Sequence, residues 1–301
     1  MTEGVKDLSN YLVCPRCKRR LQYQTETNAF NCNIHGSFPI NDGIPSFANK
    51  NEFDEHWDSN LTKDIPNSKK IIAIEFLYPI LKKYNYRNEI TILDAGCGDG
   101  VHANVIHEFA KENNLQIKYT GLDVSQSALR AAKNRNVEYT FLNADISELP
   151  LKDDYFDIVF SFGVLAYMDV PTIGFEELVR VCKPSGSIGI WLYPKDNSFM
   201  GYLFLLVRKM CQKLGSKFTR VVADLIVPML VFLPTKSGVN LKNSTWKQCR
   251  EIVMVNIEPK QLSFFDEQDI KSWFKYNDVA IIFEDKINKI TLWGEKHSHN
   301  D

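Results

Sequence analysis

An apolar run near the middle of the chain leads into a turn with three glycines. Residues 92–100 read ILDAGCGDG, and a helical pattern begins near Val101. Glycine lets the backbone pass close to a ligand and adopt dihedral angles that other residues avoid. The helix that follows offers free N–H groups to a negatively charged ligand group. The segment is therefore typical of a small-molecule site, with a purely structural tight turn as the alternative.

An acidic residue follows the next predicted strand. Residues 121–125 read GLDVS, and a carboxylate at the place of Asp123 can accept both hydroxyls of a ribose. The glycines are spaced Gly-x-Gly-x-Gly, so the Gly-x-Gly-x-x-Gly pattern of nicotinamide-cofactor proteins is not met. The Gly-Lys-Ser/Thr of phosphate-binding loops is also missing from this turn.

These segments resemble the class I S-adenosylmethionine-dependent methyltransferases. Residues 93–98 match the pattern that ends the family's first strand, and 143–146 resemble its third motif. Residues 155–165 resemble the fourth strand with its exit loop, and 180–187 resemble the turn before the fifth strand. The resemblance covers about residues 90–195. It implies an α/β fold, a Rossmann-like seven-stranded sheet with helices on both faces and an antiparallel final strand.

The resemblance also implies S-adenosylmethionine as cofactor and assigns residues to it. The glycine turn would border the methionine half, Asp123 would hold the ribose, and Asp145 would meet the adenine amino group. The cofactor-binding residues implied in this way are Asp94, Gly96, Cys97, Gly98, Asp123, Val124, Ala144, Asp145, Ile146 and Phe162.

Methyl transfer depends more on correct positioning of the acceptor than on acid–base catalysis. The cofactor carries the activated carbon, and the protein aligns the acceptor and excludes water. Relatives that act on small molecules often carry a histidine after the fourth strand, where this chain reads LAYM at 165–168. Tyr167 either lines an acceptor pocket or packs in the fold, and packing is favoured. We therefore name no catalytic residue.

A second group of chemistry-bearing residues lies near the amino terminus. Cys14 and Cys17 form a C-x2-C pair, and Cys32 and His35 form a C-x2-H pair. Three thiolates and one imidazole suit tetrahedral zinc, and four protein ligands leave no open position for catalysis. The set resembles a zinc ribbon, and residues 38–47 resemble a segment of Trm112-like proteins. We expect a structural zinc site, with a decayed site without metal as the alternative.

Apolar runs that alternate with amphipathic segments predict strands joined by helices, and so a parallel sheet with right-handed crossovers. The predicted strands of this region cover residues 90–95, 118–122, 137–142, 156–160 and 187–193. The predicted domains are a zinc-ribbon-like module at 1–48, a linker and packing helix at 49–89, and a methyltransferase domain at 90–301 with a helical insert at 196–235.

The insert interrupts this alternation. Two apolar stretches, 199–207 and 221–233, flank a basic middle that we interpret as a hinge. We favour a lid over an apolar acceptor, or a helical hairpin buried against the core. Peripheral contact with an anionic membrane through 196–235 is the third interpretation. The basic residues are Arg208, Lys209, Lys213, Lys217 and Arg220.

The charge composition of the chain limits the kinds of binding partner that we expect. Lys and Arg total 36 against 37 for Asp and Glu, a net charge of −1 that supplies no global attraction for nucleic acid. Residues 1–8 contain no apolar signal region, so the expected location is cytoplasmic, with membrane association as an alternative. The leading hypothesis is methyl transfer to a small-molecule or lipid-like acceptor. RNA methylation is the second, a non-catalytic cofactor-binding scaffold the third, and no pattern indicates an oligomeric state.

Overall fold

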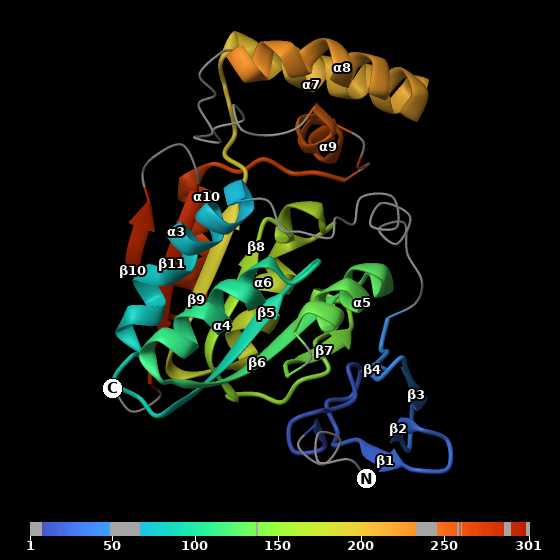
Figure 1. Cartoon of the computed structure of the whole chain (residues 1–301). Helices are drawn as coiled ribbons and strands as arrows, with labels where there is room; N and C mark the ends of the chain where they lie inside the picture. Colours follow the sequence, from blue (N-terminus) through green and yellow to red (C-terminus); the bar gives the residue numbers. More distant parts are fainter. Residues whose placement is uncertain are drawn as a thin grey trace.

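The computed structural model describes residues 8–48, 67–136, 138–232, 246–257, 259, 261–285 and 290–298 (Figure 1). Residue 137 of one predicted strand, residues 49–66 of the predicted linker and residues 233–235 of the predicted insert lie outside the described residues.

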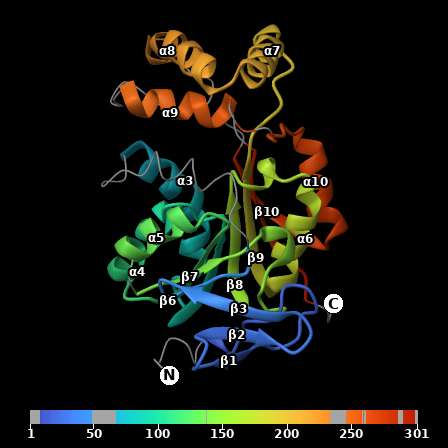
Figure 2. The ribbon, with the colours of Figure 1, turned by 90° about the vertical axis from the view of Figure 1, so that its right-hand side faces the viewer.

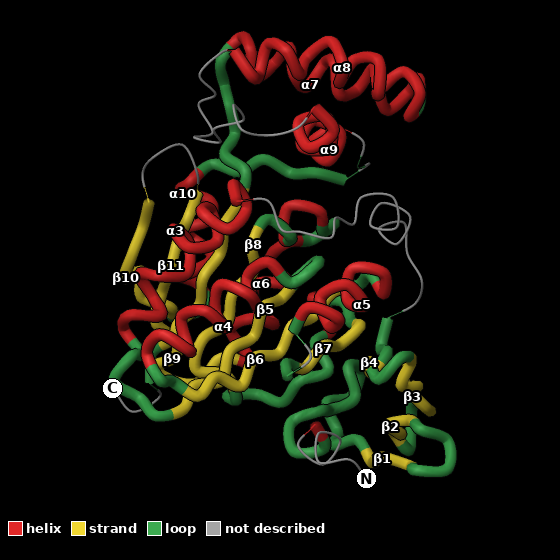
Figure 3. Tube along the Cα trace, in the orientation of Figure 1, coloured by secondary structure: helices red, strands yellow, loops and turns green. Residues whose placement is uncertain are grey.

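The predicted seven-stranded sheet is confirmed and forms the centre of the molecule (Figure 3). Its strands are β5 (Glu89–Ala95), β6 (Gln116–Asp123), β7 (Thr140–Asn143), β8 (Phe156–Phe162), β9 (Cys182–Leu192), β10 (Val279–Asp285) and β11 (Ile290–Lys296). Their order is β10-β11-β9-β8-β5-β6-β7. Strands β5 to β9 pair in parallel, whereas β11 is antiparallel to both of its neighbours. The carboxyl ends of the parallel strands therefore meet at one edge.

Helices cover both faces of the sheet, as predicted. In Figure 2, α3, α4 and α5 lie on one side of the strands, and α6 and α10 lie on the other. Such burial on both faces explains why the central strands are almost continuously apolar. The helices are α3 (Asn67–Lys83), α4 (Val101–Asn113), α5 (Gln126–Arg135), α6 (Pro171–Val181) and α10 (Glu267–Tyr276), with the short 3-10 helices η1 (Ile146–Glu148) and η2 (Leu165–Tyr167).

Local sequence sets where two of these helices begin. Helix α4 starts directly after Gly100, whose φ of 81° is in the left-handed region. Helix α5 starts after Ser125, whose side chain accepts a hydrogen bond from the N–H of Ala128 at 3.3 Å. That bond satisfies one of the N–H groups that a helix leaves unpaired at its start. Both helix starts lie next to the carboxyl ends of β5 and β6.

The amino-terminal residues form a small antiparallel sheet at the β7 edge of the large one (Figure 1). Ser46 forms a parallel bridge with Asn143, and Leu12 an antiparallel bridge with Leu151. This module thereby covers an edge strand that would otherwise present unpaired backbone groups. Its strands are β1 (Gln22–Gln24), β2 (Ala29–Cys32), β3 (Gly36–Asn41) and β4 (Ile44–Pro45).

Tyr11 ties the module to the core of the large domain. Its ring stacks on Tyr155 with centroids 4.7 Å apart, and its hydroxyl lies 3.4 Å from the hydroxyl of Thr120. Tyr11 is buried and belongs to the same apolar cluster as residues of β5 and β8. The module and the large sheet therefore share one core.

The insert lies at the other end of the molecule from the module in both ribbon views (Figures 1 and 2). Its helices are α7 (Phe199–Leu214), α8 (Ser216–Phe232) and α9 (Trp246–Ile257). The basic stretch spans the end of α7 and the start of α8, and the two helices break within it, at Gly215. Helix α9 was not predicted. A hairpin buried against the core does not fit either, since Phe199 is 80% exposed and Leu225 70% exposed.

Within the described ranges, none of the helices combines the length and the apolar character needed to cross a bilayer.

The shared core predicts that the module and the large domain unfold together. We expect Tyr11→Ala to lower the free energy of unfolding by about 3 kcal/mol, because a large packed aromatic side chain is lost. Chemical denaturation followed by circular dichroism should show one transition at a lower midpoint. Tyr276→Ala is the matched control, since Tyr276 is 84% exposed. An early separate transition of the module would contradict the shared core.

Candidate cofactor and metal sites

The glycine turn lies between β5 and α4, at the carboxyl edge of the sheet. Gly96, Gly98 and Gly100 all have positive φ, at 91°, 51° and 81°. At Gly96 a Cβ atom would lie 2.2 Å from Cγ2 of Val164, so no larger residue fits there without a shift. The N–H of Gly96 donates to the carbonyl of Leu122 at 2.6 Å. The turn is thus held against the end of β6.

Asp123 joins this turn from the end of β6, as the sequence predicted. One carboxylate oxygen accepts the N–H of Gly98 at 2.9 Å, and the other accepts the N–H of Ser125 at 2.9 Å. The two carboxylate oxygens together have about four acceptor positions, so the backbone donors leave part of the acceptor capacity for a ligand. Burial of the carboxyl group raises the pKa of Asp123 to about 6, against backbone hydrogen bonds from Ser125, Gly98 and Val124, although the residue stays partly exposed. The group is therefore mainly ionised at neutral pH.

Asp94 lies beside the same turn and is fully buried. One of its oxygens accepts the hydroxyl of Tyr119 at 2.8 Å and lies 3.4 Å from Nδ1 of His102. The other oxygen is buried and has no hydrogen-bond partner in the described part of the chain. A buried carboxylate oxygen without a partner is costly. The site is therefore suited to a ligand that brings a donor.

Asn143 connects the end of β7 with the end of β6. Its side-chain amide donates to the carbonyls of Asp123 at 3.1 Å and Val124 at 2.7 Å. Its side-chain oxygen accepts the hydroxyl of Ser46 at 2.8 Å. The amino-terminal module thus reaches the cofactor-binding edge through two side chains. The sequence analysis had not assigned Ser46 to the site.

The other residues predicted to meet the adenine follow Asn143. The N–H of Ala144 donates to the carbonyl of Asp123 at 3.1 Å, which places 144–146 at the same edge. Ala144 and Ile146 are buried, whereas Asp145 is exposed. One oxygen of Asp145 accepts the N–H of Ser147 at 2.8 Å and caps η1. Cys97 is buried, and burial raises the pKa of its thiol, so it stays neutral.

Phe162, at the end of β8, begins a row of aromatic rings that leads away from this edge. Trp191 stacks on it at 4.6 Å, and Tyr193 meets Trp191 edge-on at 4.8 Å. Phe264 lies 6.2 Å from Tyr193, and Phe204 of α7 lies 6.2 Å from Phe264. We call these five residues the aromatic row. It connects the cofactor-binding edge with the insert, which the sequence alone did not show.

Polar groups accompany the aromatic row. The hydroxyl of Tyr167 lies 3.4 Å from that of Tyr193, and burial raises the pKa of both, so they stay protonated at neutral pH. Tyr167 packs against the apolar core, as predicted. The indole N–H of Trp191 and Nε of Arg208 are buried without a hydrogen-bond partner among the described residues. The rings of the aromatic row are therefore apolar, and hydrogen-bond donors on and beside them remain available for a polar group of the acceptor.

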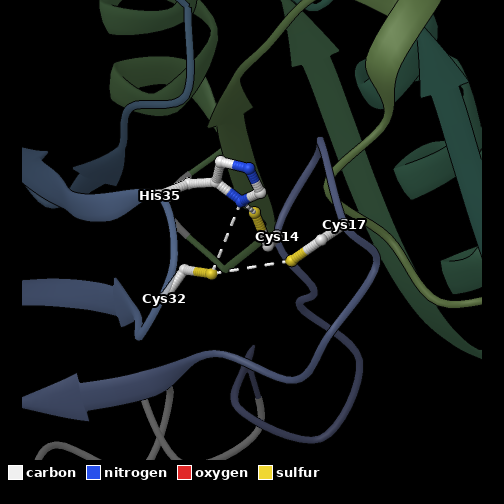
Figure 4. A group of neighbouring side chains, drawn as sticks. All are labelled: Cys14, Cys17, Cys32 and His35. Carbon is white, nitrogen blue, oxygen red and sulfur yellow. Dashed lines mark hydrogen bonds between the residues drawn. The ribbon is translucent and has the colours of Figure 1, made fainter.

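The four predicted metal ligands converge in the module (Figure 4). The Sγ atom of Cys14 lies 3.4 Å from Nδ1 of His35, and that of Cys17 lies 3.6 Å from that of Cys32. The Cys32 sulfur lies 3.8 Å from the same His35 nitrogen. A tetrahedral zinc ion, with bonds of about 2.3 Å to sulfur and 2.0–2.1 Å to nitrogen, spaces its ligand atoms by roughly 3.5–3.8 Å. The donor set therefore fits zinc in its chemistry, these three separations lie near that spacing, and all four ligand atoms lie within 4.8 Å of one another.

The loop that carries the first two ligands is attached to the large domain. Lys18 closes the turn by donating its N–H to the carbonyl of Cys14 at 2.9 Å, with a positive φ of 55°. Its ammonium group binds Glu177 of α6 at 2.8 Å and the carbonyl of Leu149 at 3.1 Å. Order at the metal site is thus coupled to the packing of the module on the sheet.

We predict that the purified chain holds about one zinc ion, by the chemistry of its four ligands. Cys32→Ser should abolish zinc binding, which elemental mass spectrometry measures. It should also lower the melting temperature, because metal binding contributes to folding. Cys249→Ser is the control, since Cys249 lies in the insert. Full zinc content in Cys32→Ser, or none in the unaltered chain purified without chelators, would contradict the site.

A family model described as "Methyltransferase domain" matches residues 93–190. A malonyl-[acyl-carrier protein] O-methyltransferase of Buchnera aphidicola is 36% identical over 109 residues, 36% of this chain and 42% of the relative. A sterol 24-C-methyltransferase of Schizosaccharomyces pombe is 30% identical over 110 residues, 35% of this chain and 29% of the relative. The chain thus spans less than two thirds of the length of these curated relatives.

Solved structures show a more distant likeness. A complex of the Haloferax volcanii Trm112 methyltransferase activator with a methyltransferase gives a TM-score of 0.49 at 14% identity, covering 83% of this chain and 100% of that chain. The magnesium protoporphyrin IX methyltransferase of Synechocystis gives 0.49 at 12% identity, covering 82% and 92%. Scores this low carry no argument about partner or substrate. The family model matches about a third of the chain, and residues 93–190 are thus similar to a methyltransferase domain.

Proposed function

We propose that this chain transfers a methyl group from S-adenosylmethionine to a small-molecule or lipid-like acceptor. The observation that carries the acceptor class is the aromatic row, which begins at Phe162 beside the cofactor-binding edge and ends at Phe204 on α7. Rings in that position offer apolar contact area to an acceptor that enters beneath the insert.

The residues at the sheet edge fit the cofactor. Asp123 would accept ribose hydroxyls, because its backbone donors leave part of the carboxylate's acceptor capacity free. The glycine turn with Asp94, Gly96, Cys97 and Gly98 would border the methionine half, and the unpartnered oxygen of Asp94 suits its ammonium group. The residues proposed to surround the adenine are Val124, Ala144, Asp145 and Ile146.

The remaining task of the protein is to position the acceptor. S-adenosylmethionine supplies a methyl group that is already activated on a sulfonium. The aromatic row would exclude water and align the acceptor, while the hydroxyls of Tyr167 and Tyr193 would hold its polar group. Both hydroxyls are protonated at neutral pH and hydrogen-bonded to each other, so the pair would act by hydrogen bonding rather than as a base. Zinc bound by the module would act on folding alone.

The relatives support an acceptor with an apolar part. Malonyl-[acyl-carrier protein] O-methyltransferases and a sterol 24-C-methyltransferase, by their names, act on an acyl-carrier conjugate and on a sterol. The net charge of −1 gives no matching support for RNA as acceptor.

Asp123→Asn should weaken binding of S-adenosylmethionine by about 1–3 kcal/mol, because a charged acceptor of ribose hydroxyls is lost. Isothermal titration calorimetry measures this directly. The matched control is Glu138→Gln on the surface, at which affinity should not change. An Asp123→Asn protein that binds as tightly as the unaltered chain would refute the assignment.

The same assignment has a pH signature. Protonation of Asp123, with its pKa of about 6, removes acceptor capacity, so affinity should fall as the pH drops from neutral to about one unit below that pKa. The decline should be absent from Asp123→Asn, because the amide does not titrate. An equal decline in both proteins would assign the pH effect to another group.

The acceptor class is tested with S-adenosylmethionine that carries a tritiated methyl group. Incubation with separated lipid, small-molecule and total RNA fractions should label the first or second. Phe264→Ala should lower kcat/KM about tenfold by removing one apolar contact, without changing cofactor affinity. Phe283→Ala, on β10, is the control. Label in RNA would contradict the acceptor class, and cofactor binding without label in any fraction would favour the scaffold function.

A further inference from the structure

Helix α7 presents an apolar stripe to solvent. Phe199, Leu203, Leu206, Met210 and Leu214 follow each other at intervals of three or four residues, so they share one helix face. Their exposed fractions lie between 41% and 80%. An amphipathic helix of a globular protein normally turns such a stripe toward the core. Here the stripe faces outward.

Helix α8 continues this surface. Lys217, Val221 and Leu225 recur every four residues and are exposed, Val221 by 58% and Leu225 by 70%. The opposite face of α8 carries the buried residues Ala223 and Val227, which pack in one cluster with residues of α7 and α9. In Figures 1 and 2, α9 lies between the other two helices and the catalytic domain. The exposed stripes therefore face away from the domain.

Positive charge accompanies the stripes. Residues 197–223 contain five basic residues and no acidic one, although the whole chain has a net charge of −1. Lys209 and Lys213 each follow a stripe residue by three positions, which places them along the same face of α7. Lys209, Lys213, Lys217 and Arg220 are exposed, and none has an ion-pair partner within the described ranges.

We propose that α7 and α8 dock the protein on an anionic lipid bilayer. The apolar stripes would enter the boundary between headgroups and acyl chains, and the flanking lysines would meet headgroup phosphates. A second copy of this chain fits less well, because it would bring two sets of unpaired cations together. Nucleic acid fits less well, because it offers nothing to the apolar stripe.

Docking in this orientation would place the aromatic row next to the bilayer. Phe204, the last ring of the row, lies on α7 itself and is only partly buried. A lipid-like acceptor could then pass from the bilayer along the row toward the cofactor-binding edge. This step rests on the proposed function, whereas the docking itself does not.

The full-length protein is tested by flotation with vesicles of phosphatidylcholine, with and without phosphatidylglycerol. It should float with the anionic vesicles, and high salt should weaken the binding. The variant Lys209→Glu/Lys213→Glu/Lys217→Glu should bind at least about tenfold more weakly, as should Leu206→Ser/Met210→Ser. The control Lys82→Glu/Lys111→Glu/Lys275→Glu changes the same net charge at exposed sites elsewhere and should bind like the unaltered chain.

Three results would overturn the proposal. One is failure to float with either kind of vesicle, and another is equal loss of binding in the control. The third is a dimer in analytical ultracentrifugation that Leu206→Ser/Met210→Ser dissociates without any vesicle binding, since a second copy would then cover the stripes. Calorimetry with S-adenosylmethionine on the same proteins separates the two proposals, because loss of docking should leave cofactor affinity unchanged.

Discussion

The hydrogen bond from the Gly98 N–H to the Asp123 carboxylate joins the turn after β5 to the end of the neighbouring strand β6, and the candidate site depends on this link. A partly buried carboxylate is costly unless it is paired, and here backbone donors pair it. They reach it because glycines allow the turn to adopt left-handed dihedrals close to β6. The carboxylate is therefore fixed in place by backbone while it keeps acceptor positions for a ligand.

The amino-terminal module braces this edge from outside. Ser46 binds Asn143, and Asn143 in turn binds the backbone of Asp123 and Val124. The module also closes the β7 edge and shares its core through Tyr11. The module is small, and its own apolar area would not be enough to stabilise its fold. A metal ion bound by the four converging ligands would supply that stability. A metal bound by the module would thus influence the candidate site through this packing, without taking part in chemistry.

The insert differs from the sheet edge in how its apolar side chains are packed. The cluster among α7, α8 and α9 buries residues such as Cys211, Ala223 and Met254, while the large apolar side chains of the α7 stripe lie outside it. A lid that simply closed over a pocket would turn those larger residues inward. The arrangement is instead that of a helical layer with one face on the domain and one apolar face toward its surroundings. The aromatic row connects that layer with the sheet edge.

The sequence by itself determined the glycine turn, Asp123 and the four metal ligands, because dihedral limits and ligand spacing act over a few neighbouring residues. The alternation of strands and helices also indicated the parallel part of the sheet, whereas the seven strands and the antiparallel final strand were implied only by the family resemblance. Only the tertiary structure brought Tyr119 and His102 to Asp94, Ser46 to Asn143, and the distant rings into one row. Likewise, the sequence periodicity of α7 reveals an apolar stripe. It does not show whether the neighbouring helices pack against that stripe or against the opposite face of α7. That side is decided by packing between segments far apart in the chain, and so the outward orientation of the stripe was visible only in the folded molecule.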